Sequence, residues 1–246
     1  MDIREFLQHL SRGVLSNMAL SNNGDGTIRD RDLHRVVAAI NSGLMVLHTI
    51  FTLRKNSVTL LMSEGKTIYE VMPEFSIAGS GMPMDQAIAA GMHILDTAEQ
   101  PFTGDVLRFL EARGLHGARL PINDMDRADS IYTTQPNIIQ VPYPEHVVVL
   151  YLTYQASHPP IKVTQIPDTT QYEVEGFLEI PSVLWEALEQ YVGYKIYDVL
   201  NTADSVRRSQ MLEVAFNESC QRLIDRDILS YSESHTSERF ELNGWR

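Results

Sequence analysis

The stretch from Ile180 to Asp227 decides the fold, and it reads IPSVLWEALEQYVGYKIYDVLNTADSVRRSQMLEVAFNESCQRLIDRD. Proline is tolerated in the first turn of a helix, where its missing N–H is not needed, so Pro181 predicts a helix start. Apolar residues then recur at helical spacing, stop at the polar run 201–205, and resume with the same period. The sequence therefore predicts an antiparallel pair of amphipathic helices. Their apolar stripes are Leu184, Leu188, Val192, Ile196 and Val199, and then Leu212, Ala215, Phe216, Cys220 and Leu223.

Neither stripe can be buried by its partner alone, so the pair needs further helices, and the front of the chain supplies them. Asp2 can cap a first helix, in which Gly13 is a tolerated weak point. A second helix begins at Asp30 or Asp32. Burial of all four stripes against one another predicts a four-helix core. The front stripes are Ile3, Phe6, Leu7, Leu10, Val14 and Met18, and then Leu33, Val36, Val37, Ile40, Leu44, Leu47 and Phe51.

Between the helix pairs the apolar period changes from 3.6 to 2, which is typical of strands. Two strand-like runs, 57–62 and 66–71, flank Ser63-Glu64-Gly65 and predict a β-hairpin. Prolines and glycines break up the segment from Met72 to Pro101, where residues 86–95 could form a short helix. Further strands are expected at 105–111, 131–133, 138–141, 147–155 and 177–180.

These elements predict an α+β fold with a β-rich domain inserted into a four-helix bundle. The bundle joins an N-terminal and a C-terminal helix pair, and an extended tail follows it. We expect residues 1–51 and 181–229 to form the bundle, 52–180 the inserted domain and 230–246 the tail.

The tail combines a polar spacer with isolated large side chains. It is polar as far as Glu238 and then carries Phe240, Leu242 and Trp245. Side chains placed in this way are suited to bind a pocket on a partner protein. The alternative is that they dock back on their own domain.

The charge and the cysteine content limit the possible partners. The chain has 20 Lys and Arg against 32 Asp and Glu, a formal net charge of −12. Proteins that bind nucleic acid by neutralising phosphates need clustered Lys and Arg, so such binding is not expected. The single cysteine, Cys220, excludes an intrachain disulfide and is expected to be buried. The charged first residues and the lack of a long apolar run predict a cytoplasmic chain with no membrane partner.

The best motif match for chemistry is the segment 21–32, which mimics a calcium-binding loop between two helices. Asn23 and Asp25 stand at its third and fifth positions. However, Ser21 stands where the first carboxylate is expected, and Asp32 replaces the glutamate of the twelfth position. Either the segment binds calcium or it forms an Asn/Gly turn before the second helix, and we predict the turn.

Signals for catalysis are missing from the sequence. The eight histidines never pair at ligand spacing with a second His or with Cys. There is no nucleophile elbow, no kinase or nucleotide signature, and no carboxylate pair spaced for acid–base chemistry. We therefore predict no catalytic residue, no cofactor, no metal and no enzyme activity. Tyr191, Tyr194 and Tyr197 step along one helix, where they either pack within the chain or meet a neighbouring subunit.

One set of short stretches occurs in a recognisable order. It opens with Ile40-Asn41-Ser42-Gly43-Leu44 and Leu47-His48-Thr49-Ile50-Phe51. It continues with FTGDVL at 102–107, SIYT at 130–133, VPYP at 141–144, YQASHP at 154–159, LEIP at 178–181 and ALEQYV at 187–192, and it closes with Phe240 and Gly244-Trp245. In this order the chain resembles the head-to-tail adaptor, or connector, proteins of tailed bacteriophages. The segment 72–99 has no counterpart in the pattern.

The resemblance implies a structural virion protein with a helical bundle and a β insertion. Members of that family assemble as a ring, usually of twelve copies, that joins the portal to the tail and lines the DNA channel. The implied partners are copies of the chain, the portal protein and a downstream tail or nozzle protein, with DNA passing through unbound. The implied location is the neck of the virion, after synthesis in the host bacterial cytoplasm. The acidic charge suits such a channel, because a basic lumen would retain DNA.

Two alternatives remain. Another neck or tail-tube component is one, although a tube protein would be mostly β, whereas this chain has helices at both ends. A small-ligand-binding protein or enzyme with an inserted β domain is the other. It would require a set of polar residues gathered in a pocket, and the sequence does not provide one.

Overall fold

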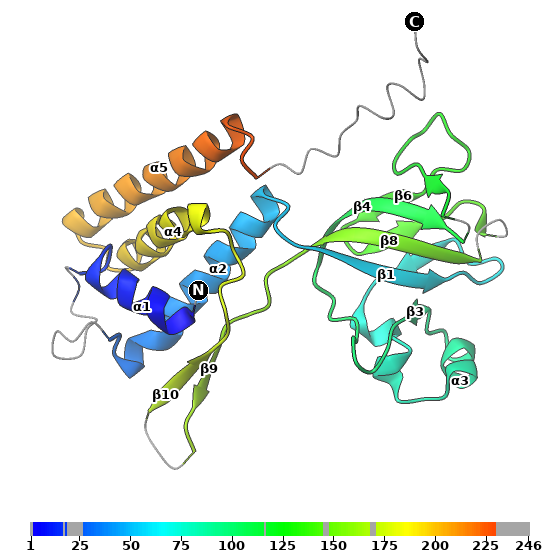
Figure 1. The fold of residues 1–246 in the computed structure, drawn as a ribbon, viewed down its shortest axis with the longest axis horizontal. Coiled ribbons are helices and arrows are strands. Elements are labelled where there is room, and N and C mark those ends of the chain that lie inside the picture. The colour runs from blue at the N-terminus through cyan, green and yellow to red at the C-terminus, as the bar shows by residue number, and fades with distance from the viewer. Residues whose placement is uncertain are drawn as a thin grey trace, which may run out of the picture. The chain divides into compact units, whose positions relative to one another are not determined.

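A computed structural model describes residues 2–16, 18, 27–115, 117–144, 148–167 and 171–229. The fold is α+β, as predicted, with helices near both ends of the chain and antiparallel sheets between them (Figure 1). Its internal contacts divide it into two compact units. We call Met1–Thr52 with Pro160–Arg246 the helical unit, and Leu53–Pro159 the β unit.

The first helix of the helical unit is shorter than the sequence suggested. α1 spans Ile3–Arg12, and the Asp2 carboxylate accepts a hydrogen bond from the Arg4 N–H at 2.9 Å, which confirms the predicted cap. The predicted continuation of the apolar stripe to Met18 is wrong, because the helix ends at Gly13. Glycine is a frequent end point of helices, and here that preference prevails over the apolar period.

The second helix, α2, spans Asp30–Ile50 and agrees with the prediction. Asp30 and Asp32 lie in its first turn, where a negative charge is favourable to the helix dipole. Among the described helices α2 alone is long and apolar enough to cross a membrane by length and composition, which the sequence reading did not anticipate. Half of the relevant window is buried inside the protein, as in the core helix of a folded domain.

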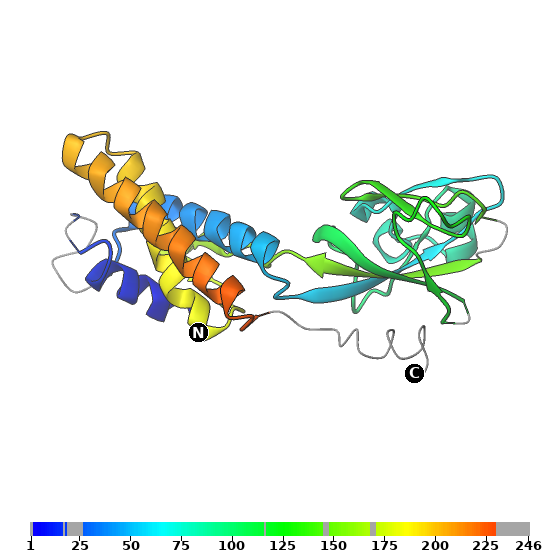
Figure 2. The same cartoon turned by 90° about the horizontal axis from the view of Figure 1, so that it is seen from above.

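The C-terminal pair consists of α4, Trp185–Asp198, and α5, Ala203–Asp225, which lie side by side (Figures 1 and 2). A turn of 3-10 helix, Ser182–Leu184, follows Pro181 and leads into α4. Thr202 and Ser205 form a capping box at the start of α5, since each side chain accepts a hydrogen bond from the backbone N–H of the other. The predicted helical pair is therefore confirmed.

Helix α4 packs closely against neighbouring segments of the helical unit. α4 packs on both α5 and α2. A Cβ atom on Gly193 of α4 would lie 2.9 Å from Cδ1 of Leu212 on α5 and would also meet the side chain of Val14. The Tyr197 hydroxyl donates to the Val14 carbonyl at 3.2 Å, so the segment after α1 is attached to α4 as well.

A β-hairpin also belongs to the helical unit. It is formed by β9, Lys162–Gln165, and β10, Tyr172–Glu175. Asn41 on α2 fixes its base, because its side-chain amide donates to the Ile161 carbonyl at 2.9 Å and accepts from the Ile161 N–H at 2.8 Å. The sequence reading placed this segment in the inserted domain, whereas its contacts join it to the helices.

Two antiparallel sheets form the β unit. The larger has the order β3-β1-β8-β4-β5, and the smaller has the order β2-β7-β6. Their apolar faces share one core, to which Tyr69 and Ile139 contribute from the smaller sheet and Leu60, Phe109 and Leu152 from the larger. The strands are β1 Lys55–Leu61, β2 Ile68–Glu70, β3 Ile94–Leu95, β4 Val106–Gly114, β5 Arg119–Leu120, β6 Tyr132–Gln135, β7 Ile138–Gln140 and β8 Val149–Ala156.

Two strand predictions are wrong. The runs 57–62 and 66–71 form strands but no hairpin, because β1 pairs with β8 and β3 whereas β2 pairs with β7. The period-2 pattern identifies a strand but carries no information on its partner. The run 177–180 is not a strand, since β10 ends at Glu175 and Phe177 makes a single bridge with Asp2.

The segment from Met72 to Pro101 forms short elements. It contains 3-10 turns at Pro73–Phe75 and Ala78–Ser80, followed by helix α3 at Met84–Ala89. The short helix expected at 86–95 is thus present, although it begins earlier and ends before β3.

Gly193→Val tests the close packing around α4. The added side chain would overlap Val14 and Leu212, so we expect the free energy of unfolding to fall by about 1–3 kcal/mol. Urea denaturation followed by circular dichroism measures this change. Gly114→Val is the control, because a Cβ on Gly114 meets nothing within 4 Å and valine suits a strand. Equal stability of both variants would contradict the packing argument.

Candidate interaction surface

The inner face of α5 combines short hydroxyl side chains with Leu212, which lies against Gly193 of α4, and one aromatic ring. Phe216 packs on Tyr191 of α4 with ring centroids 5.2 Å apart. The Ser209 hydroxyl donates to the Tyr194 carbonyl at 3.2 Å, and the Ser219 hydroxyl donates to the Gln190 side chain at 3.0 Å. Short hydroxyl side chains allow the two helices to approach closely, but they bury little apolar area.

The outer side of α5 carries exposed apolar residues. They are Met211 at 65% exposure, Val214 at 56%, Ile224 at 49% and Ile228 at 50%, the last just beyond the helix end, and we call these four residues the outer α5 surface. A single exposed apolar residue is normal in a soluble protein. A helix that packs on one side is expected to be polar on the other, so four such residues indicate a surface for a partner.

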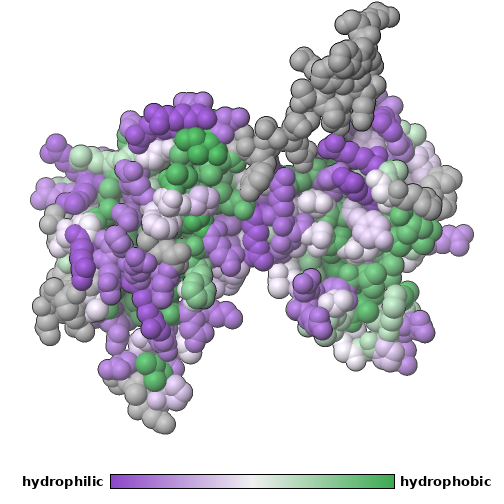
Figure 3. All heavy atoms as spheres, viewed as in Figure 1, coloured by the Kyte–Doolittle hydropathy of each residue, from purple (hydrophilic) through white to green (hydrophobic). Residues whose placement is uncertain are grey.

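Charged residues of both signs lie beside and between the residues of the outer α5 surface. Arg207, Glu213, Glu218 and Arg222 are all exposed on the same helix. Apolar residues within such a mixed rim are typical of protein–protein interfaces. On the face of the helical unit seen in Figure 3, apolar residues likewise form a compact area among hydrophilic ones.

The three tyrosines of α4 are engaged inside the helical unit. The hydroxyls of Tyr191 and Ser42 lie 2.9 Å apart, and Tyr197 bonds to the segment after α1. The ammonium of Lys195 lies 4.6 Å from the ring centroid of Tyr194. These contacts support packing within the chain over a row of tyrosines reserved for a neighbouring subunit.

The predicted tail anchors, Phe240, Leu242 and Trp245, lie outside the described residues. So do most residues of the calcium-like segment, of which the structure describes the part from Thr27 onward. Asp32 belongs to the first turn of α2 and pairs with the guanidinium of Arg31 at 3.3 Å. Within the described part of the chain, no group of three or more His, Cys, Asp or Glu could hold a metal ion.

Two cavities of the helical unit are lined by charged residues that bond to their own surroundings. One, of about 560 Å³, is lined by three arginines. Arg35 donates to the Ile196 carbonyl at 2.7 Å, Arg208 stacks 5.1 Å from the ring centroid of Tyr197, and Arg31 pairs with its neighbouring aspartate. These contacts make the arginines part of the packing of α2, α4 and α5.

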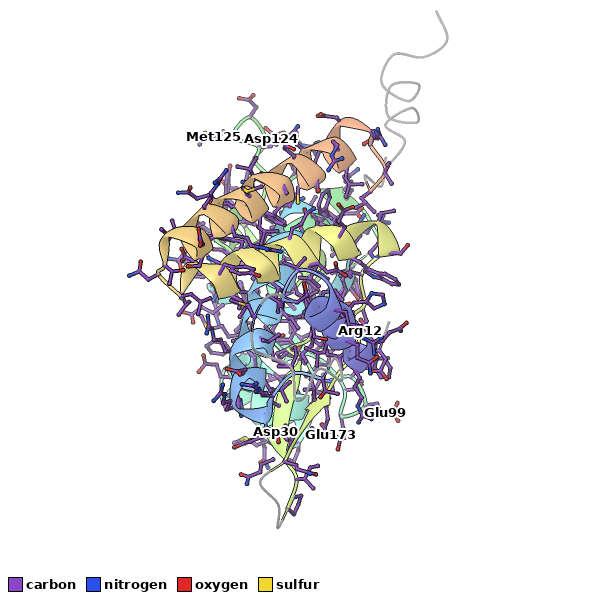
Figure 4. The ribbon with its side chains drawn as sticks, turned by 90° about the vertical axis from the view of Figure 1, so that its left-hand side faces the viewer. Arg12, Asp30, Glu99, Asp124, Met125 and Glu173 are labelled. Atoms are coloured by element: carbon purple, nitrogen blue, oxygen red, sulfur yellow. The ribbon has the colours of Figure 1, made fainter. Side chains whose placement is uncertain are left out.

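The second cavity, of about 400 Å³, lies between α1, α2 and β10. Asp30 and Glu173 both line it, and Figure 4 labels the two residues near one another. Arg4 forms an ion pair with Glu173, so α1 is bound to the hairpin. Neither cavity gathers a nucleophile, a base and an orienting group, which catalysis would require.

His93 is a buried histidine of the β unit. Its Nε2 lies 2.8 Å from the Glu70 carbonyl, to which it donates, and its Nδ1 lies 3.4 Å from the ammonium of Lys66. Burial lowers the pKa of His93, although hydrogen bonds with the carbonyls of Gly91 and Glu70 act in the opposite direction. A neutral ring that accepts from Lys66 fits this geometry, and it connects β2 with the segment before β3.

A loop of the β unit presents the highly exposed apolar side chain of Met125. Met125 is 90% exposed at the outer end of this loop (Figure 4). The Asp124 N–H donates to the Ser130 hydroxyl at 2.9 Å, and the Tyr132 hydroxyl donates to the Asp124 carbonyl at 3.3 Å. A braced loop with an exposed methionine at its tip is suited to contact a partner.

The sequence matches no protein-family model and no curated protein. Sequence reasoning identified the inner stripe of α5 but missed the outer α5 surface. Met211 and Val214 are apolar but lie off that stripe, and this position in the sequence could have identified them as exposed apolar residues.

The neutral His93 ring predicts a pH dependence of stability. Its pKa is lowered in the folded state, so the unfolded chain takes up the proton first as the pH falls below about 6.5. The stabilisation is complete above that pH and is lost as the pH approaches the folded-state pKa, by at most ~1.4 kcal/mol per pH unit. Urea denaturation at several pH values should show a smaller slope for His93→Gln than for the unaltered chain. Identical slopes would contradict the neutral buried ring.

Cys220 offers a probe of the α4–α5 contact. Burial raises the pKa of its thiol to about 11, and its side chain is 4% exposed. We expect a disulfide reagent at pH 8 to label the folded chain at least about tenfold more slowly than the chain in urea, because the thiolate is the reactive form. Labelling at equal rates would show that α5 separates readily from α4.

Proposed function

We propose that this chain is a structural virion protein, a head-to-tail adaptor that forms a ring between the portal and the tail of a bacteriophage. The outer α5 surface is the observation that carries the proposal, because it offers an apolar area to another protein. The α+β architecture, with strands between two sets of helices, fits the expected bundle and insertion. The ordered series of short motifs supports the same family.

In this proposal α1, α2, α4 and α5 form the four-helix core, and residues 230–246 form an extended tail. Each copy presents the outer α5 surface to a different face of the next copy. Repeated contacts of that kind close into a ring when the rotation between copies divides a full turn. Phe240, Leu242 and Trp245 then anchor the tail on a neighbouring copy or on the portal, and a tail or nozzle protein binds below.

The proposed ring lines the channel for DNA. A chain with a net charge of −12 repels the phosphates, so DNA passes without being retained. The protein is made in the host bacterial cytoplasm and is incorporated into the neck of the virion. Its role is structural and involves no catalysis or cofactor.

Electron microscopy of the purified chain mixed with portal-bearing heads tests this function. We expect a ring below the portal, with copy number set by rotational symmetry. A stacked tube would instead support a tail-tube component. The absence of any assembly, together with a measurable turnover of a small substrate, would overturn the proposal in favour of an enzyme.

Substitution of the outer α5 surface should stop assembly without unfolding the chain. Met211→Glu with Val214→Glu places two buried charges in the proposed contact, and we expect binding to portal-bearing heads to weaken at least about tenfold. Leu115→Glu is a matched control, since this leucine of the β unit is 51% exposed. Sedimentation with heads measures binding, and circular dichroism checks the fold. Undiminished binding of the double variant would exclude this surface from the ring contact.

A further inference from the structure

The cavity of about 560 Å³ in the helical unit brings together arginines that are distant along the chain. Arg31 and Arg35 come from the first two turns of α2, and Arg208 comes from the first two turns of α5. Volumes of about 300–1,000 Å³ are usual for sites that bind small molecules. The cavity is therefore large enough for a small ligand, and it offers three guanidinium groups.

The lining of this cavity carries a net positive charge, although the whole chain has a formal net charge of −12. Besides the three arginines, its charged residues are Asp32 and Asp204, so three positive charges stand against two negative ones. Asp32 is already paired with Arg31 at 3.3 Å. An anion is therefore favoured over a cation at this place.

The contacts that position the arginines use only part of their hydrogen-bonding capacity, since a guanidinium carries five N–H donors. Arg35 donates to the Ile196 carbonyl through Nη2 at 2.7 Å. Arg208 is held by a cation–π contact, 5.1 Å from the ring centroid of Tyr197, and no hydrogen bond with the described residues uses its N–H groups. Both side chains are thus fixed in position while donors remain for a ligand.

Arg35 also has a buried donor without an acceptor. Its Nε is shielded from solvent and has no hydrogen-bond partner among the described residues. Native structures leave few buried polar groups without a partner, so such an atom calls for an explanation. Arginine commonly binds an oxyanion through two parallel N–H groups, and a ligand oxygen bound in this way would supply the missing acceptor.

The start of α5 borders the cavity and adds donors of a second kind. Thr202 and Ser205 line it and satisfy one another in the capping box. The N–H groups of Ala203 and Asp204 lie in the first turn, where a helix offers no acceptor of its own. The positive end of the helix dipole favours an anion there, and phosphate in particular is often bound at such a terminus.

We propose that this cavity binds the phosphate group of a small organic phosphate. Arg31, Arg35 and Arg208 hold the phosphate oxygens. Leu200, which is 45% exposed, and Met18 line the same cavity and contact the organic part. A phosphate fits better than a carboxylate, because its three terminal oxygens can meet donors from α2 and α5 at the same time. The site is separate from the outer α5 surface and goes beyond the proposed structural role.

Isothermal titration of the full chain with phenyl phosphate, inorganic phosphate and benzoate is the first test. We expect saturable binding of phenyl phosphate, at least about tenfold tighter than that of either other compound, because only phenyl phosphate combines a phosphate with an apolar part. Equal or tighter binding of inorganic phosphate would overturn the organic ligand, and equal or tighter binding of benzoate would overturn the preference for phosphate. No binding of phenyl phosphate would overturn the site itself.

Arg208→Leu and Arg207→Leu form a matched pair of variants. Arg208 lines the cavity, whereas Arg207 is its exposed neighbour on α5 and does not. Hydrogen bonds between charged groups are stronger than neutral ones, so we expect Arg208→Leu to weaken phenyl phosphate binding at least about tenfold. Arg207→Leu should bind as the unaltered chain does, and circular dichroism checks the fold. Equal affinities of the two variants would overturn the assignment to this cavity.

Arg31→Leu keeps the test decisive if Arg208→Leu does not fold. Its side chain is 72% exposed, so little packing is lost. A ligand that binds only the folded chain stabilises it, so phenyl phosphate should raise the urea midpoint of the unaltered chain and of Arg207→Leu. We expect a clearly smaller shift for Arg31→Leu. Equal shifts in all three proteins would overturn the site, whatever the outcome for ring assembly.

Discussion

The helical unit depends on the close packing of α4. Its Gly193 lets Leu212 of α5 and Val14 approach within contact distance, and Gly43 of α2 does the same for Leu188 and Tyr191. Because α4 is buried on both sides, its position determines where the other helices can lie. Residues from both ends of the chain must therefore be present before this unit can form. The strands of the β unit, by contrast, belong to one continuous segment with a core of its own.

The sequence predicted helices and strands correctly where one apolar period, 3.6 for a helix or 2 for a strand, ran through the whole segment. The helix at Asp30–Ile50, the C-terminal pair and most strands follow from apolar spacing, and Asp2 follows from the chemistry of a cap. The sequence did not predict which strands pair, because pairing depends on segments that are distant along the chain. The two runs around Gly65 looked like a hairpin, yet they join different sheets, since β1 pairs with β8 and β2 pairs with β7.

The candidate surfaces were even less accessible to sequence reasoning. A stripe predicts the buried face of a helix, but it does not show that Met211 and Val214 stay exposed on another side of it. Similarly, Asp96 has no motif of its own. Its carboxylate accepts hydrogen bonds from the Ser76 hydroxyl, which precedes it by 20 residues, and from the Phe102 N–H, and the fold brings these donors together.

The contrast between the two sides of α5 connects stability with assembly. The inner side combines Ser209 and Ser219, which contribute hydrogen bonds of modest net value, with the Phe216 ring and with Leu212, which lies against Gly193 of α4. The outer side leaves apolar area in water. A partner that binds only the folded chain stabilises it, and more so the higher its affinity, so a partner that covered the outer α5 surface would add to the stability that the contact with α4 provides. An isolated copy would then be the least stable form of the protein, and assembly would complete a helical unit that one chain leaves partly uncovered.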